Sequence, residues 1–187
     1  GGALVRLKDV AIGYDSRTVV DGVSFSIESG ERVALLGKNG SGKSSLLKLI
    51  CGENISYTGT LELGKGLVIS HVPQDTTGLR GGLKDFARAQ RADETLLFTI
   101  LRKLGFSRTQ FEKDLSDFSA GQRKKALLAA SLCSSAHLYI WDEPFNYIDV
   151  ISRIQLEELI EAYAPTMLFV EHDATFVENM ATRTVQL

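Results

Sequence analysis

The sequence is poor in cysteine, proline and tryptophan, and it has no long hydrophobic run. Its 187 residues include 2 cysteines, 3 prolines and 1 tryptophan. Cys51 and Cys133 stand in apolar helical segments, which is typical of buried thiols in the reducing cytosol. The apolar runs, such as 33–36, are far shorter than the roughly 18 residues that a membrane span requires. We therefore expect a cytoplasmic protein that does not insert directly into a membrane.

Neither sign of charge dominates. The 21 Lys and Arg residues against 23 Asp and Glu residues give a net charge of −2, so the overall charge does not indicate nucleic-acid binding. No charged segment followed by an apolar one stands at the start, so we expect no secretory signal. Because the chain starts with Gly1-Gly2 instead of Met and stops directly after a strand-like segment, we expect a piece of a longer protein. Its length predicts a single domain over residues 1–187.

The hydrophobic pattern predicts an α/β fold. Alternating apolar and polar residues predict antiparallel strands at 3–10 and 18–27, and continuous apolar residues at 32–36 predict a strand buried on both faces of a parallel sheet. A helical insert is expected at 79–117, where apolar residues recur at helical spacing. The remaining expected strands are 61–63, 67–72, 138–141 and 167–170, and the remaining helices are 43–51, one from Ser119, 151–163 and one from Ala174. This order favours a largely parallel core sheet with an antiparallel β subdomain and a short helical subdomain.

Residues 37–44 read Gly-Lys-Asn-Gly-Ser-Gly-Lys-Ser and match the phosphate-loop pattern G-x-x-x-x-G-K-[ST], after a buried strand and at the start of a helix. Backbone N–H groups of such a loop surround phosphate oxygens, because its glycines allow close approach and unusual φ angles. Lys43 is expected to neutralise the β- and γ-phosphates, and the Ser44 hydroxyl to bind Mg²⁺. An ordinary glycine-rich turn is the alternative. The predicted nucleotide-binding residues of this segment are Gly37, Asn39, Gly40, Ser41, Gly42, Lys43, Ser44 and Ser45.

An acidic pair follows the apolar strand at 138–141. Asp142 stands at the carboxyl end of that strand, the edge of an α/β sheet at which ligands bind, so we assign it to Mg²⁺. Glu143 is then a candidate to orient or deprotonate the attacking water. Two solvated acids at a strand end are the alternative, and the phosphate loop argues against it.

The phosphate loop, the segment Phe118-Ser119-Ala120-Gly121-Gln122 before a helix and the run Asp142-Glu143-Pro144 together resemble the ATP-binding cassette (ABC) ATPases, in the right order and over essentially the whole chain. The resemblance implies a P-loop NTPase fold of ABC type with ATP and Mg²⁺ as ligands. It implies that Gln74 is the Q-loop glutamine, which approaches Mg²⁺ and senses the γ-phosphate. It also implies that His172 is the switch histidine that contacts the γ-phosphate and that Tyr14 stacks on adenine. Residues 146–149 match the D-loop of the family.

The signature segment of the resemblance includes Ser119, Gly121 and Gln122. Ser119 is a good helix N-cap and Gly121 permits close approach, so this helix start is a second anion site. Because the helical insert separates Ser119 from Lys43, we expect that they do not reach one nucleotide within a monomer. The resemblance implies that a second cassette, in the same parent chain or in a homodimer, pairs head to tail, with each ATP between one phosphate loop and the signature segment of the other.

The run Asp142-Glu143-Pro144-Phe145-Asn146-Tyr147-Ile148-Asp149 is similar to the corresponding segment of the ABC-F family, and the helical insert is short compared with that of transporter cassettes. The resemblance therefore implies the second cassette of an ABC-F antibiotic-resistance protein that acts on the ribosome and hydrolyses ATP, weakly as an isolated domain. One alternative is the nucleotide-binding subunit that energises an ABC membrane transporter. Another is a module that binds ATP and hydrolyses it only incidentally.

Overall fold

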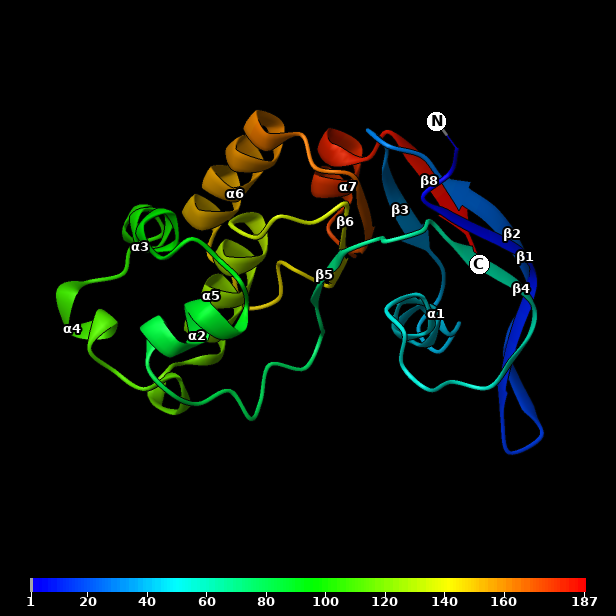
Figure 1. Ribbon diagram of the computed structural model, residues 1–187, viewed down its shortest axis with the longest axis horizontal. Coiled ribbons are helices and arrows are strands. Elements are labelled where there is room, and N and C mark those ends of the chain that lie inside the picture. Colours follow the sequence, from blue (N-terminus) through cyan, green and yellow to red (C-terminus); the bar gives the residue numbers. More distant parts are fainter. Residues whose placement is uncertain (1) are drawn as a thin grey trace. The chain divides into compact units, whose positions relative to one another are not determined.

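The computed structural model describes residues 2–187, which separate into two compact units (Figure 1). The first unit comprises residues 2–71, Ala136–Asp142 and Pro165–Leu187 and holds the sheets. The second comprises Val72–Ser135 and Glu143–Ala164 and is helical. The helical unit is wider than the expected insert at 79–117, because it also contains the two helices that follow the insert in the sequence.

Two sheets form the first unit. The antiparallel sheet has the order β2-β1-β4, with β2 at Arg17–Ile27, β1 at Val5–Tyr14 and β4 at Tyr57–Leu63. The second sheet has the order β5-β6-β7-β3-β8, and β3 pairs in parallel with both β7 and β8, as β6 does with β7. Its strands are β5 (Ile69–Val72), β6 (Leu138–Asp142), β7 (Met167–Val170), β3 (Arg32–Leu36) and β8 (Arg183–Gln186). The predicted α/β fold with a largely parallel sheet and an antiparallel subdomain is confirmed.

The limits of the antiparallel strands differ from the expected ones. Strand β1 runs on to Tyr14, well past the expected end at residue 10. Strand β4 begins at Tyr57, before the expected start at residue 61. Residues 57–60 bury no side chain, so the sequence does not need to alternate apolar and polar residues there. Their place in the sheet comes from backbone pairing with β1, for example between Thr60 and Lys8.

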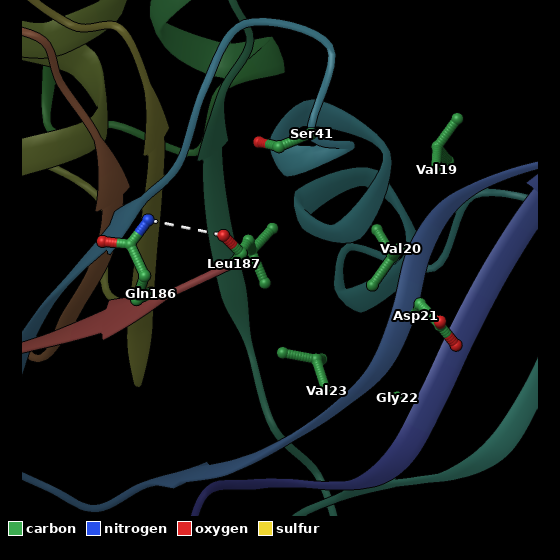
Figure 2. A pocket seen from close by; sticks show the side chains of 8 residues that line it. All are labelled: Val19, Val20, Asp21, Gly22, Val23, Ser41, Gln186 and Leu187. Carbon is green, nitrogen blue, oxygen red and sulfur yellow. Dashed lines mark hydrogen bonds between the residues drawn. The ribbon is translucent and has the colours of Figure 1, made fainter.

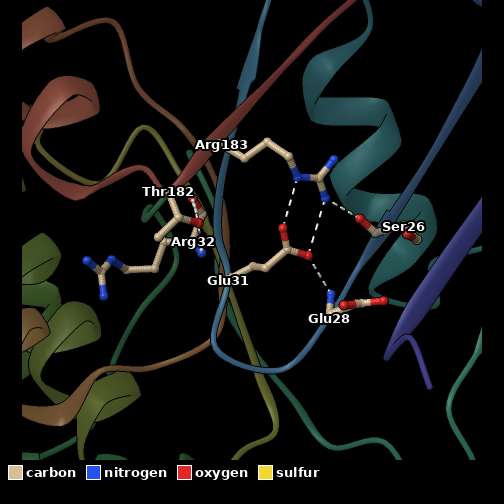
Figure 3. Close-up of polar contacts among 6 residues, drawn as sticks. All are labelled: Ser26, Glu28, Glu31, Arg32, Thr182 and Arg183. Atoms are coloured by element: carbon tan, nitrogen blue, oxygen red, sulfur yellow. Dashed lines mark hydrogen bonds and ion pairs between the residues drawn. The ribbon is translucent and has the colours of Figure 1, made fainter. Parts of the chain in front are cut away.

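One apolar core joins the two sheets of the first unit to the helix α1 (Lys43–Ile50), and the unit also contains α7 (Ala174–Met180). Polar contacts add to this core at the amino end of β8 (Figure 3). Arg183 forms an ion pair of 2.9 Å with Glu31 and donates a hydrogen bond to the Ser26 carbonyl of β2. The hydrogen bond from Arg183 lowers the pKa of Glu31 below its ordinary value. Arg183 therefore links both sheets and the turn before β3.

The second unit is built from short helices around α5 (Ala120–Leu132). Helix α3 (Glu94–Lys103) contacts both α2 (Leu83–Ala89) and α5, because its apolar residues recur on one face and are buried there. Edge-to-face aromatic contacts reinforce this unit, such as that between Phe106 and Phe118, whose ring centroids lie 5.6 Å apart. The remaining helices are α4 (Arg108–Phe111), the 3-10 turn η1 (Leu115–Asp117) and α6 (Val150–Tyr163).

The two cysteines lie at the C-caps of α1 and α5. Cys51 and Cys133 are half-buried, so they are less buried than the sequence predicts. Burial nevertheless raises the pKa of each thiol to about 12. No helix within residues 2–187 is long and apolar enough to span a bilayer.

Candidate functional site

The loop between β3 and α1 adopts left-handed turns at two of its three glycines. Gly40 and Gly42 have φ angles of 80° and 84°. A Cβ at Gly42 would lie 2.5 Å from Val20 Cγ2 and 2.9 Å from the Val19 carbonyl oxygen, so only glycine fits there. Ser41 Oγ is buried and has no hydrogen-bond partner within residues 2–187. Left-handed turns that expose N–H groups at the start of a helix suit this loop to an anion such as phosphate.

Lys43 and Ser44 begin α1 and face this loop and the end of β6. Lys43 is 8% exposed, and its ammonium donates to the carbonyl oxygens of Gly37 and Lys38, which holds it at the loop. Ser44 Oγ donates to Asp142 Oδ2 across 2.7 Å. A hydroxyl and a carboxylate at this separation are oxygen ligands of the kind that Mg²⁺ prefers. The structure thus brings together two of the residues expected at the metal.

Protein side chains alone do not form a metal cage. Within residues 2–187, no group of three or more His, Cys, Asp or Glu side chains could hold a metal ion. Mg²⁺ does not need such a cluster, since it is usually held by one or two protein oxygens together with substrate phosphates and waters. Ser44 and Asp142 supply such a pair of oxygens.

His172 and Tyr14 lie in the same unit as the loop. Strands β6, β7 and β3 are parallel neighbours, so Asp142, His172 and the phosphate loop all follow carboxyl ends at one edge of the sheet. His172 is exposed, and its backbone N–H donates to Glu171 Oε1 across 3.0 Å. Tyr14 is 47% exposed, and its hydroxyl donates to Ser45 Oγ across 3.1 Å. The ring of Tyr14 is therefore held next to α1.

A cavity of about 330 Å³ borders the phosphate loop at Ser41. Figure 2 shows that valine side chains of β2, the exposed Asp21 and the end of the chain at Leu187 also line it. The carboxylate of Asp21 repels phosphate, and most of the other lining side chains are apolar. We assign this cavity no role in phosphate binding.

Gln74 and Glu143 meet in the second unit. Gln74 Nε2 and Asn146 Nδ2 each donate to Glu143 Oε2 across 2.8 Å. Glu143 and Tyr147 have left-handed φ angles of 50° and 67°, an unusual conformation for residues with side chains and one that clusters at functional sites. The predicted Q-loop glutamine and the predicted catalytic acid thus form one hydrogen-bonded group. Glu143 directly follows Asp142 in the sequence, and the peptide bond between them joins this group to the first unit.

The signature segment satisfies its own helix start. Ser119 is the N-cap of α5, as predicted, and forms a capping box with Gln122: the Ser119 hydroxyl accepts from Gln122 N–H at 3.1 Å, and Gln122 Oε1 accepts from Ser119 N–H at 2.9 Å. A Cβ on Gly121 would lie 2.6 Å from the carbonyl oxygen of Tyr147. Close backbone packing against the segment 146–149 therefore requires glycine at position 121. This requirement is separate from the close approach of phosphate that the sequence predicts here.

Sequence reasoning missed two lysines of α5. Lys125 forms an ion pair of 2.9 Å with Asp149 and donates to the Leu104 carbonyl at 3.0 Å. The hydrogen bond from Lys125 lowers the pKa of Asp149 to about 2, and Asp149 in turn caps α6. Lys124 is 1% exposed and donates to three backbone carbonyls. In the sequence, the position of Lys124 and Lys125 shortly after the signature segment was the only indication of a role for them.

Comparisons with known proteins show similarity in sequence and in fold. A family model described as "ABC transporter" matches residues 20–146. The chain is 31% identical over its whole length to the "ATP-binding protein Uup" of Caulobacter vibrioides, of which it spans 32%. It is 32% identical over 96% of its length to the "Ribosome protection protein VmlR" of Bacillus subtilis, of which it spans 33%. A solved structure, "Structure of ATP binding subunit of ABC transporter", superposes with a TM-score of 0.83 at 25% identity, over 98% of this chain and 85% of that chain.

Proposed function

We propose a function for this chain, which belongs to the ABC transporter family. It is the ATP-binding and ATP-hydrolysing cassette of an ABC-F protein that acts on the ribosome. Membership of this family of ATPases implies nucleotide binding and ATP hydrolysis in general. Two hydrogen bonds carry the proposal, one between Ser44 and Asp142 and one between Gln74 and Glu143. Each bond joins two residues that the ATPase reaction requires near the γ-phosphate.

In the proposed reaction, the phosphate loop binds the nucleotide. Backbone N–H groups at Gly40 and Gly42 face the phosphates, and the Lys43 ammonium neutralises the β- and γ-phosphates. Tyr14 stacks on the adenine and Ser45 anchors its hydroxyl. Ser44 and Asp142 would hold Mg²⁺, which would supply charge neutralisation at the phosphates.

The proposed hydrolytic step depends on Glu143. Its carboxylate accepts hydrogen bonds from the amides of Gln74 and Asn146, which orient it before the attacking water arrives. Glu143 then orients that water or accepts its proton, and His172 contacts the γ-phosphate. Preorientation matters because a general base works only within hydrogen-bond reach of the proton that it takes.

ABC cassettes work as dimers, and we propose that a second cassette binds head to tail to this one. It would place its own signature segment on this phosphate loop, and Ser119, Gly121 and Gln122 of this chain on its nucleotide. Exposed apolar side chains in and just after the segment 146–149 support a protein interface, since Tyr147 is 75% and Ile151 71% exposed. An isolated cassette then hydrolyses ATP weakly, because each site lacks its second half.

The ribosomal role rests on the relatives and on the segment 142–149. The Bacillus relative is named a ribosome protection protein, and the chain matches it over nearly its whole length. The chain spans about a third of that relative and of the Caulobacter one, so activities of the longer proteins come to this chain only as proposals. We propose a cytoplasmic cassette, the second of its parent protein, that protects the ribosome from an antibiotic.

Cosedimentation tests this role. The intact protein that carries this cassette should sediment with ribosomes when ATP is present and leave them when nucleotide is removed. The second candidate is the nucleotide-binding subunit of a membrane transporter, which the match to 85% of a solved transporter subunit favours. Sedimentation with membranes, together with integral subunits, would replace the ribosomal role by this one.

A further inference from the structure

Lys124 is a buried cation inside the helical unit. It lies on α5, two residues after Gln122, and is 1% exposed. Lysine is almost never buried to this extent unless its charge is compensated. Its ammonium donates to the carbonyl oxygens of Pro73, Gln74 and Glu143 across 3.4, 3.5 and 3.4 Å. These distances lie at the long end of the hydrogen-bond range, so the ammonium is shared among three backbone acceptors.

These acceptors belong to the residues of the proposed catalytic group. Gln74 and Glu143 are joined by a hydrogen bond between their side chains, and their backbone carbonyls also share the Lys124 ammonium. The two residues are 69 positions apart in the sequence, so no local backbone geometry sets their spacing. The side-chain bond and the shared ammonium close a ring of contacts that fixes both residues against α5. A side chain without N–H donors at position 124 would remove one half of this ring.

We propose that Lys124 is a positioning residue that holds Gln74 and Glu143 in place relative to α5, the helix that begins at the signature segment. The inference rests on the proposed ATPase function and deepens it. The hydrogen bonds from Lys124 to Pro73, Gln74 and Glu143 go to backbone carbonyls of its own unit, so we assign it this positioning role. When a second cassette binds the signature segment, a shift of α5 would therefore change the position of Glu143 through Lys124.

The test is Lys124→Met in the intact protein, since methionine keeps an unbranched side chain, one atom shorter than that of lysine, and removes its donors. We expect the kcat of ATP hydrolysis to fall by about 10- to 100-fold, as a displacement of about 1 Å of a catalytic group can cause, while the KM for ATP stays within about twofold. Lys113→Met, on an exposed lysine of the same unit, is the matched control and should match the wild type. A role only in folding would lower the number of ATP-binding sites and leave the kcat per site unchanged.

A double-mutant cycle with Gln74→Ala sharpens the test. If Lys124 acts through Gln74 and Glu143, the two substitutions together should lower kcat by much less than the product of their separate effects. Lys124→Gln keeps an amide donor, so it should retain more of the wild-type kcat than Lys124→Met. An unchanged kcat per site in Lys124→Met, or multiplicative effects in the cycle, would overturn the proposal. Insolubility of both position-124 variants would assign Lys124 to folding and overturn it too, whereas an inactive wild-type protein would refute the ATPase function itself.

Discussion

The Ser44 hydroxyl donates a hydrogen bond to Asp142 Oδ2 across 2.7 Å, although the two residues are 98 positions apart in the sequence. The order β6-β7-β3 brings them together, because parallel strands deliver their carboxyl ends to one edge of the sheet. A hydroxyl and a carboxylate thus lie beside a loop that is shaped for phosphate.

Replacing Lys43 by alanine should weaken ATP binding by about 10- to 100-fold, because a hydrogen bond to a charged group contributes roughly 1.5–3 kcal/mol. Isothermal titration calorimetry of the intact protein measures the change. Lys48→Ala, on an exposed lysine in the last turn of the same helix, is the control and should leave the affinity unchanged. Tight binding by Lys43→Ala would contradict the assignment of the phosphate loop.

The substitution Glu143→Gln should retain ATP binding and lower turnover by roughly 10²- to 10⁴-fold, the range that a general base contributes. Glutamine keeps the size of the side chain and loses the negative charge. The closed pair of cassettes should then persist with ATP, which analytical ultracentrifugation or cross-linking detects. Glu158→Gln, on an exposed acid of α6, serves as the control. Near-normal hydrolysis by Glu143→Gln would remove this residue from its proposed role.

Adding a methyl group at Gly121 should destabilise the helical unit by about 1–3 kcal/mol, because the new Cβ would lie 2.6 Å from the Tyr147 carbonyl oxygen. Urea denaturation of wild type and Gly121→Ala measures the free energy of unfolding. In Gly82→Ala the added Cβ meets nothing within 4 Å, so this control should lose less than about 1 kcal/mol, the usual cost of an altered N-cap. Equal stability of both variants would show that the segment 146–149 moves aside freely.

The ion pair between Lys125 and Asp149 should stabilise the fold in a pH-dependent way. The folded-state pKa of Asp149, about 2, lies below its ordinary value of 3.8. Its contribution is therefore full above pH 3.8 and is lost as the pH falls through about 2. Because the Asp149 side chain is 54% exposed, we expect only about 0.2–1 kcal/mol. Comparing the unfolding free energies of wild type and Asp149→Asn at pH 7 and pH 3 tests this, and a difference that grows on acidification would refute it.

The phosphate loop and the core sheet could be predicted from the sequence because their signals are local. Glycines at fixed spacing after an apolar strand indicate the loop, and continuous apolar residues indicate strands buried on both faces. The expected N-cap at Ser119 is confirmed for the same reason, since its partner Gln122 lies only three residues away. Strand β4 was found only in part, because its first residues are exposed and its pairing with β1 depends on distant backbone groups.

By itself the sequence determined the order of the elements, the phosphate loop and the acidic pair 142–143. Only the tertiary structure decided which distant groups meet: Gln74 with Glu143, Gly121 with Tyr147, and Lys124 with the carbonyls around them. The physical reason is that hydrophobic periodicity and turn chemistry act over a few residues, whereas a buried ammonium or a missing Cβ has meaning only in relation to the atoms that the fold brings next to it.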